Sequence, residues 1–420
     1  MKNIKTNPNR IVNEKTLMAT VDISKEKHMG YYRCPDGKEV KPFEFFNNAR
    51  GFHQFWEGIV QTMRAQGLKD VVVGLESTGP YAEPLVHYLR KKPVRLVQVN
   101  PMHTKRLKEL QGNSPNKTDR KDPKVIADII GLGHALTLVI PEGPAAELRR
   151  LTQARERSMQ RRTALFNQLQ HLVFVLFPEF LVVMPNVKTQ TAKYLLKHHP
   201  RPQDIVNYDP EALALSLRRI SYGKVGKERI QALYTAARES VGIQHGQEGI
   251  VFEITNLLQL IEVSERFIAD IKHKMSSLLQ QIPYSRSILS IKGIGEVTAA
   301  GLIGEVGDFR QFKTISEITK LAGLDLFEIS SGKHQGHRRI SKRGRPLLRK
   351  LLFCAAVHMV SHVGIMRETY RQYLQRGMLK MKALIAIARK LLRIIFALVR
   401  DHKEYVPGYI KAQNVLTEAA

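Results

Sequence analysis

The stretch Leu17-Met18-Ala19-Thr20-Val21-Asp22-Ile23 is an apolar run that ends close to an acidic residue. A second run, Val71-Val72-Val73-Gly74-Leu75-Glu76, has the same form and closes on a carboxylate. Short apolar runs rich in β-branched residues indicate buried strands. We therefore expect a carboxylate at the end of each of two strands, an arrangement suited to a metal-dependent phosphodiester site.

The segments around these two runs predict further strands and helices. Residues 31–46 indicate a hairpin that continues from the first strand, and Asn48 can cap a helix with apolar residues at helical spacing. We expect a helix after the second run and another strand at residues 94–99, which ends at Asn100-Pro101. This order predicts an α/β domain with a mixed sheet and helical crossovers.

Two further carboxylates lie in the segment Thr118-Asp119-Arg120-Lys121-Asp122. Because Asp119 and Asp122 are three residues apart, both point to one face if the segment opens the helix that follows. That face could share metal ions with Asp22 and Glu76, since Mg²⁺ prefers oxygen ligands. The alternative is that Asp119 caps the helix and Asp122 is a solvated acid favoured by the helix dipole. For four acids in this order we prefer the metal site.

The charge of the chain indicates a polyanionic partner. The 420 residues contain 66 Lys and Arg against 38 Asp and Glu, a formal net charge of +28. Such an excess favours binding to nucleic acid over binding to an acidic protein. The length predicts two or three domains, each able to bury a core.

Neither a membrane anchor nor a zinc or disulfide framework is indicated. The apolar stretches 172–184 and 383–399 are broken by Pro178-Glu179 and by basic residues, respectively, so neither resembles a spanning helix. Cys34 and Cys354 are the two cysteines and lie far apart without a CxxC spacing. We expect a protein of the reducing cytoplasm, associated with the nucleoid and without a membrane partner.

Helical patterns dominate the rest of the chain. Two long amphipathic stretches, about 148–173 and 254–271, predict helices that face each other as an antiparallel coiled coil. After Pro283 a compact, basic helical domain begins. The expected divisions are a disordered arm at 1–15, an α/β domain at 16–143, a helical region at 144–282 with an insertion around 198–249, a helical domain at 283–410 and a tail at 411–420.

The sequence Ile288-Leu289-Ser290-Ile291-Lys292-Gly293-Ile294-Gly295 has the pattern of a helix-hairpin-helix. In that motif a turn containing Gly293 and Gly295 exposes backbone amides that hold a phosphate without reading bases. An ordinary glycine turn between two helices is the alternative. The basic context favours phosphate contact.

Four segments together resemble those of a known family. They are Val21-Asp22-Ile23-Ser24, Gly74-Leu75-Glu76-Ser77-Thr78-Gly79, Val99-Asn100-Pro101 and Asn116-Lys117-Thr118-Asp119-Arg120-Lys121-Asp122. The family comprises insertion-sequence transposases with an N-terminal DEDD domain of the RuvC-like, ribonuclease-H-like fold and a C-terminal domain bearing a serine, and it includes the RNA-guided bridge recombinases. The resemblance implies four catalytic acids that bind Mg²⁺: Asp22, Glu76, Asp119 and Asp122. Asp128 lies six residues beyond Asp122 and is expected off their shared face.

The C-terminal half resembles the same family in its serine motif. Leu321-Ala322-Gly323-Leu324 and Ile329-Ser330-Ser331-Gly332 match that motif, in which the serine directly before glycine is the nucleophile. The resemblance therefore implies that Ser331 attacks, with the neighbouring Ser330 as the alternative. The chain departs from the family's commoner form at Asp325-Leu326, where a proline is usual.

A group of basic residues follows the two serines. From Ser331 to Lys350 there are eight Lys or Arg residues and no acid. Such a group could hold a scissile phosphate and stabilise the charge that develops on it, or it could be a solvated loop that binds any polyanion. The residues for which we predict phosphate contact are Lys333, Arg338, Arg339, Lys342, Arg343 and Arg345.

The resemblance implies a DNA transposase or recombinase that joins Ser331 to DNA as a phosphoserine intermediate. It also implies donor and target DNA as partners, together with a structured noncoding guide RNA. The family acts as dimers or tetramers in which the acidic domain of one protomer meets the serine domain of another. Two alternatives remain: a metal-dependent junction nuclease in which water attacks, and a noncatalytic nucleic-acid-binding protein.

Overall fold

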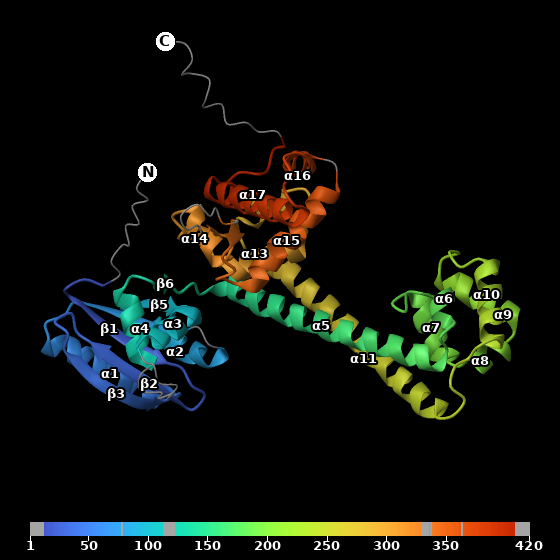
Figure 1. Ribbon diagram of the computed structural model, residues 1–420, viewed down its shortest axis with the longest axis horizontal. Helices are drawn as coiled ribbons and strands as arrows, with labels where there is room; N and C mark the ends of the chain where they lie inside the picture. Colours follow the sequence, from blue (N-terminus) through green and yellow to red (C-terminus); the bar gives the residue numbers. More distant parts are fainter. Residues whose placement is uncertain are drawn as a thin grey trace, which may run out of the picture. The chain divides into compact units, whose positions relative to one another are not determined.

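The protein forms two compact units, Met1–Ile140 and Pro141–Ala420. The computed structural model describes residues 12–76, 79–111, 122–328, 336, 338–362 and 364–407 (Figure 1). The first unit contains a sheet with helices, and the second is mainly helical.

A six-stranded sheet forms the centre of the first unit, in the order β3-β2-β1-β4-β5-β6. β1 pairs in parallel with β4, and β4 with β5, whereas the other three pairs are antiparallel. The predicted mixed sheet is confirmed, and it is compatible with a ribonuclease-H-like domain. The strands are β1 Thr16–Asp22, β2 Lys27–Arg33, β3 Glu39–Phe46, β4 Asp70–Glu76, β5 Arg95–Val99 and β6 Leu136–Thr137.

Helices cover both faces of this sheet because the strand residues alternate between two cores. Leu17 and Val21 of β1 belong to a core with α1 and α2, whereas Met18 packs with α4 on the opposite face. Asn48 caps α1 as predicted, since its side chain accepts a hydrogen bond from the Gly51 amide at 2.9 Å. The helices are α1 Ala49–Ala65, α2 Glu83–Leu89, α3 Pro101–Gln111 and α4 Asp122–Gly131, with a short 3-10 helix at Pro80–Ala82.

α4 lies very close to the sheet at Gly74 of β4. A Cβ at this position would come closer than 3.0 Å to Ile130 Cδ1, so a larger residue would displace Ile130. On the neighbouring strand β1, Thr20 Oγ1 donates to the Pro123 carbonyl at 2.6 Å in a buried hydrogen bond. The start of α4 is thereby held against β1 and its body against β4.

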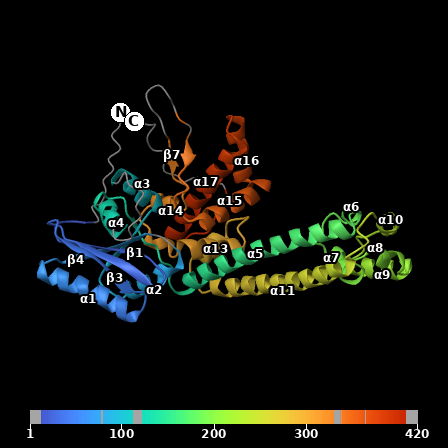
Figure 2. The same ribbon diagram turned by 60° about the horizontal axis from the view of Figure 1, so that its bottom comes forward.

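Two long helices, α5 Gly143–Leu176 and α11 Gln247–Leu279, run side by side in the second unit (Figure 1, Figure 2). Leu148 near the start of α5 shares a core with Met275 near the end of α11. Leu169 near the end of α5 shares a different core with Ile254 near the start of α11. The two helices are therefore antiparallel, with one hydrophobic core at each end of the pair.

A group of five helices lies between α5 and α11 in the chain and forms one of these cores. The fully buried Leu195, Leu213 and Leu233 belong to it, together with the adjoining ends of α5 and α11. The predicted insertion therefore contributes to a core away from the C-terminal helices. Its helices are α6 Phe180–Val183, α7 Gln190–His198, α8 Pro202–Val206, α9 Pro210–Ile220 and α10 Lys227–Arg238.

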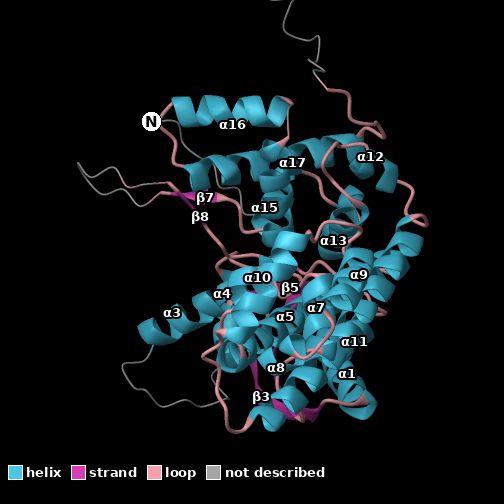
Figure 3. Cartoon of the chain, turned by 90° about the vertical axis from the view of Figure 1, so that its right-hand side faces the viewer, coloured by secondary structure: helices cyan, strands magenta, loops and turns pink. Residues whose placement is uncertain are grey.

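The C-terminal helices form the other core. They are α12 Ser285–Leu289, α13 Glu296–Val306, α14 Ile315–Leu321, α15 Pro346–Ser361, α16 Ile365–Gln375 and α17 Lys380–Arg400, with a 3-10 helix at Phe309–Gln311. Figure 3 shows a short strand pair, β7 Leu326–Phe327 and β8 Arg339–Ile340, beside these helices. Across the described part of the chain, no single helix has the length and apolarity to cross a membrane, and α15 with α16 passes that test only as a pair bent by 93°.

Candidate functional site

Asp22 and Glu76 lie at one edge and on one face of the sheet. β1 and β4 are parallel neighbours with Val21 opposite Leu75, so the residues that end both strands lie beside each other. Because side chains alternate along a strand, both carboxylates face the side on which α4 packs. α4 begins at Asp122. Three of the four predicted acids therefore belong to elements that converge at this edge.

α3 contacts two of these acids through side chains one helical turn apart. Thr104 Oγ1 lies 3.0 Å from Glu76 Oε2 and 2.8 Å from the Pro101 carbonyl, so its hydroxyl proton is shared between two acceptors. Lys108 Nζ lies 2.6 Å from Asp122 Oδ2. Since residues four apart share a helix face, one face of α3 contacts both Glu76 and Asp122.

The carboxylate oxygens at this edge suit a hard divalent cation, which prefers oxygen ligands and keeps several waters. The Lys108 ammonium already lies against Asp122, so this position accepts positive charge. Within residues 12–76, 79–111, 122–328, 336, 338–362 and 364–407, no group of three or more His, Cys, Asp or Glu side chains is arranged to hold a metal ion. The fourth predicted acid, Asp119, lies outside the described residues.

Asp128 belongs to a different group of charges. Its Oδ1 lies 2.6 Å from Arg33 Nη1, and Arg33 also contacts Glu39 at 3.1 Å. Lys124 Nζ lies 2.8 Å from Glu39 Oε2. The hydrogen bond from Lys124, followed by that from Tyr31, lowers the pKa of the Glu39 carboxyl to about 2. Asp128 therefore links α4 to β2 through Arg33.

A two-stranded hairpin flanks the serine motif. β7 and β8 pair antiparallel, with Leu326 opposite Ile340 and Phe327 opposite Arg339. The chain between these strands contains Ser330, Ser331 and Lys333, which lie outside the described residues. The strand pair therefore brings together the two ends of the segment that carries both serines.

Two glycines hold the base of this hairpin. A Cβ on Gly344 would come closer than 3.0 Å to backbone atoms of Gly323 and Leu321. Arg345 N donates to the Leu321 carbonyl at 2.7 Å across the same contact. The chain after β8 is thereby held against the end of α14 through close backbone contacts, and the Arg349 guanidinium also donates to the Ala322 carbonyl at 3.1 Å.

Asp325, where the chain departs from the family's commoner proline, closes the hairpin with Ser341. The Asp325 carboxylate accepts a hydrogen bond from the Ser341 hydroxyl, and the Asp325 carbonyl accepts one from the Ser341 amide at 2.9 Å. Burial, followed by the charge of Arg393, lowers the pKa of the Arg389 guanidinium, and the charge of Asp325 opposes that shift. Asp325 thus connects the two sides of the hairpin in a basic surrounding.

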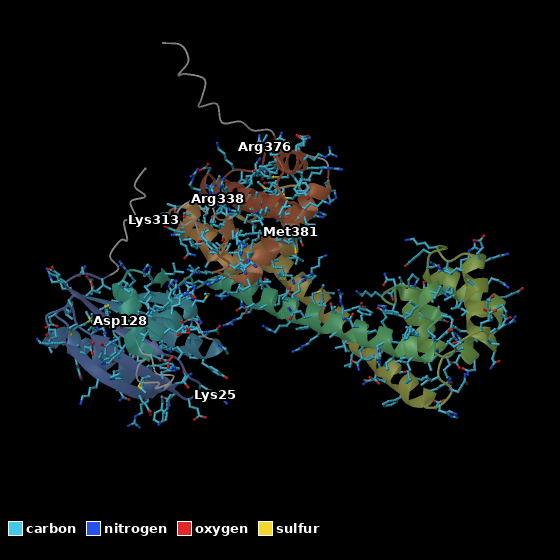
Figure 4. All side chains as sticks on the ribbon, in the orientation of Figure 1. Lys25, Asp128, Lys313, Arg338, Arg376 and Met381 are labelled. Atoms are coloured by element: carbon cyan, nitrogen blue, oxygen red, sulfur yellow. The ribbon has the colours of Figure 1, made fainter. Side chains whose placement is uncertain are left out.

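Five of the six basic residues predicted to contact phosphate are described by the structure, and they form two groups. Four of them are exposed and lie directly before, in or after β8, and we call them the hairpin cations: Arg338, Arg339, Lys342 and Arg343. Arg338, labelled in Figure 4, is 76% exposed and pairs with Glu328 at 2.9 Å. Arg345 differs, because its guanidinium donates to the Glu305 carbonyl and burial lowers its pKa to about 10. The contacts of Arg345 favour a role in the helical core.

The glycine turn predicted within residues 288–295 joins α12 to α13. Gly293 has a φ of 101°, and Gly295 is the N-cap of α13. The first amides of an α-helix lack acceptors within the helix and can donate to an anion. The turn therefore has a geometry compatible with the predicted phosphate contact.

Several residues of the site were not predicted from the sequence. Thr104 and Lys108 had a local signal, because Asn100 caps α3 through its side chain and Pro101 is the first helical residue. With the helix start known, the four-residue spacing places both side chains on one face. Gly344 had no such signal, since its contacts come from the end of α14.

The sequence matches two family models. Residues 19–178 match a DEDD transposase model of the IS110 type, described as "Transposase". Residues 285–371 match a model described as "Transposase IS116/IS110/IS902 family". The α/β unit and the C-terminal helices thus place the chain in the class of transposases. It belongs to the IS110/IS116 family of insertion-element transposases.

Similar proteins include insertion-element and gene-inverting proteins. The insertion element IS110 uncharacterized 43.6 kDa protein of Streptomyces coelicolor is 23% identical over 388 residues, covering 92% of this chain and 94% of the relative. The transposase for insertion sequence element IS1111A of Coxiella burnetii is 25% identical over 298 residues, covering 70% and 69%. A pilin gene-inverting protein of Moraxella lacunata is 29% identical over 144 residues, covering 33% and 45%.

Proposed function

We propose that this protein is a DNA transposase that cuts and exchanges strands through a covalent phosphoserine intermediate, assisted by Mg²⁺. The observation that supports the proposal is that Asp22 and Glu76 end neighbouring parallel strands, while one face of α3 contacts both Glu76 and Asp122. Carboxylates gathered in a chain with a net charge of +28 suit a metal ion and a polyanionic substrate.

Four acids would hold the metal in this proposal: Asp22, Glu76, Asp119 and Asp122. A divalent cation bound there supplies Lewis-acid polarisation of the scissile phosphate. Thr104 and Lys108 orient Glu76 and Asp122 from α3. The Thr104 hydroxyl thus partly preorganises the Glu76 carboxylate, which reduces the cost of assembling the site.

Ser331 is the proposed nucleophile. Its Oγ attacks phosphorus and forms a phosphoserine bond, while the bond from phosphorus to the leaving deoxyribose oxygen breaks. The serine gives up its proton, and the leaving oxygen takes one up. The hydroxyl of a second cut strand then attacks the same phosphorus and restores the serine. The hairpin cations would stabilise the developing charge, and the Gly293–Gly295 turn would contact the DNA backbone without reading its sequence.

The proposed partners are those that the family resemblance implies. They are donor DNA, target DNA, a structured noncoding guide RNA that selects both, and further copies of this chain in a dimer or tetramer. In such an assembly the acids of one protomer act with Ser331 of another. α5 and α11 are proposed as a coiled-coil arm, and the arginine-rich stretch of α5 suits a nucleic-acid backbone. The proposed location is the cytoplasm, at the nucleoid.

The proposal is tested by trapping the covalent intermediate. The full-length protein is incubated with labelled DNA, its candidate RNA and Mg²⁺, and a protein–DNA band that survives denaturation is expected. Ser331→Ala should eliminate this band, whereas Ser330→Ala should retain it. Strand cleavage that persists in Ser331→Ala without a covalent band would indicate water attack and a junction nuclease.

A matched pair of acid variants on α4 tests the metal site. Asp122→Asn should abolish cleavage and preserve DNA binding. Asp128→Asn removes a carboxylate from the same helix but from the group around Arg33, so cleavage should remain. Equal loss in both variants would point to a defect of α4 rather than of the metal site, and binding without any cleavage by the unmodified protein would indicate a noncatalytic binding protein.

A further inference from the structure

One face of α3 contacts Glu76 and Asp122 through two side chains of different charge, Thr104 and Lys108. Thr104 is 3% exposed and offers Glu76 a neutral hydroxyl at 3.0 Å. Lys108 offers Asp122 a full positive charge at 2.6 Å, with the lysine side chain 37% exposed and the aspartate side chain 17% exposed. One acid is therefore held by a neutral donor and the other by a cation.

A lysine ammonium and a divalent cation compete for the same carboxylate oxygens. The ammonium is a compact charge on a flexible stem, and it contacts the Asp122 Oδ2 oxygen that a metal could use. Partly exposed ion pairs are weak, because water solvates both partners and the lysine gains freedom when it is released. A divalent cation with several oxygen ligands can therefore displace the lysine.

We propose that Lys108 is a positioning residue that holds Asp122 in the absence of metal and releases it when a divalent cation binds. Thr104 remains on Glu76 in both states, because a neutral hydroxyl donor does not compete for charge with the metal. The inference rests on the proposed function, since it assumes that Asp122 is a metal ligand. It adds a lysine that sets the metal affinity of the site.

Metal binding to the full-length protein tests this inference without measuring activity. Mn²⁺ is titrated calorimetrically into the unmodified protein and into Lys108→Met, which keeps the length of the side chain and removes its charge. We expect Lys108→Met to bind Mn²⁺ about fivefold more tightly, because the metal no longer displaces an ion pair. Lys105→Met is the matched control, since Lys105 is an exposed cation on the same helix, and its affinity should match that of the unmodified protein.

A second variant separates competition from damage to α3. Thr104→Val removes the hydroxyl that holds Glu76 and should weaken Mn²⁺ binding, whereas Lys108→Met strengthens it. Opposite effects of two substitutions on one helix face support the inference. Weaker binding in both variants would show that α3 is merely required for the fold, and would overturn it.

The remaining outcomes distinguish the inference from the proposed function. Suppose that the unmodified protein binds Mn²⁺, that Asp122→Asn abolishes binding, and that Lys108→Met binds with unchanged affinity. That result overturns the role of Lys108 alone. Absence of saturable Mn²⁺ binding in the unmodified protein and in Lys108→Met overturns the metal site itself, and the inference with it. An equal gain in Lys105→Met would indicate a general charge effect and would also overturn the inference.

Discussion

Gly74→Ala tests whether the close approach of α4 to the sheet determines the stability of the first unit. The added Cβ would come closer than 3.0 Å to Ile130 Cδ1, while its next neighbours, Ile130 Cγ1 and Ile126 Cγ2, lie at 3.4 and 3.5 Å. One methyl group therefore accounts for the clash. Overpacking of this kind costs about 1–3 kcal/mol, so we expect a loss of about 2 kcal/mol in the free energy of unfolding.

The same geometry predicts a rescue. Ile130→Val removes Cδ1 and leaves the remaining neighbours of the new Cβ at ordinary van der Waals distances. Alone, this change should cost about 0.5–1.5 kcal/mol, because a buried methyl group is lost. In combination with Gly74→Ala, the new Cβ occupies the vacated space. The double variant should therefore be more stable than the sum of the single effects by about 2 kcal/mol.

The single tryptophan of the chain, Trp56, makes the measurement specific to the first unit. It lies on α1 and packs against the core on the opposite face of the sheet from α4. Urea unfolding followed by tryptophan fluorescence therefore reports on this unit, even if the second unit unfolds separately. Equal stability of Gly74→Ala and the unmodified protein, or strictly additive effects in the double variant, would refute the packing argument.

Three further predictions concern charge and the hairpin. Replacing all four hairpin cations with Gln should weaken DNA binding for every sequence. The slope of log K against log salt concentration should become less steep by about 0.9 for each phosphate contact that is lost. A loss of affinity confined to one base position would indicate base readout instead. Because the pKa of Glu39 is lowered to about 2, the contribution of its carboxylate to the free energy of unfolding is present above pH 4.5 and is lost as the pH falls through about 2. The difference in the free energy of unfolding between the unmodified protein and Glu39→Gln, measured by urea titration, should therefore shrink over that pH range. A constant difference would contradict the lowered pKa. Gly344→Ala should abolish the covalent adduct and lower the melting temperature, since its Cβ meets the backbone of Gly323; an unchanged melting temperature would show that this backbone contact is unimportant.

Local patterns in the sequence were sufficient to predict five of the six strands of the sheet, whereas the short strand β6 was not predicted. Apolar runs ending on Asp22 and Glu76 predicted two strands that the structure contains as β1 and β4. The Asn48 cap and the hairpin of residues 31–46 were also correct. These features depend on residues close together in the chain, where propensity and periodicity are informative.

The sequence by itself also determined the excess of positive charge, the candidate acids and the position of the serine motif. Only the tertiary structure decided which of these residues lie near one another. Parallel pairing of β1 with β4 aligned Asp22 with Glu76, and the glycine contact at Gly74 allowed α4 to approach them. The contacts of Lys108 with Asp122 and of Asp325 with Ser341 join separate elements. The hydrophobic pattern and the composition of a sequence describe single segments. Contacts between separate elements depend instead on how the packed segments exclude water and on which backbones approach closely.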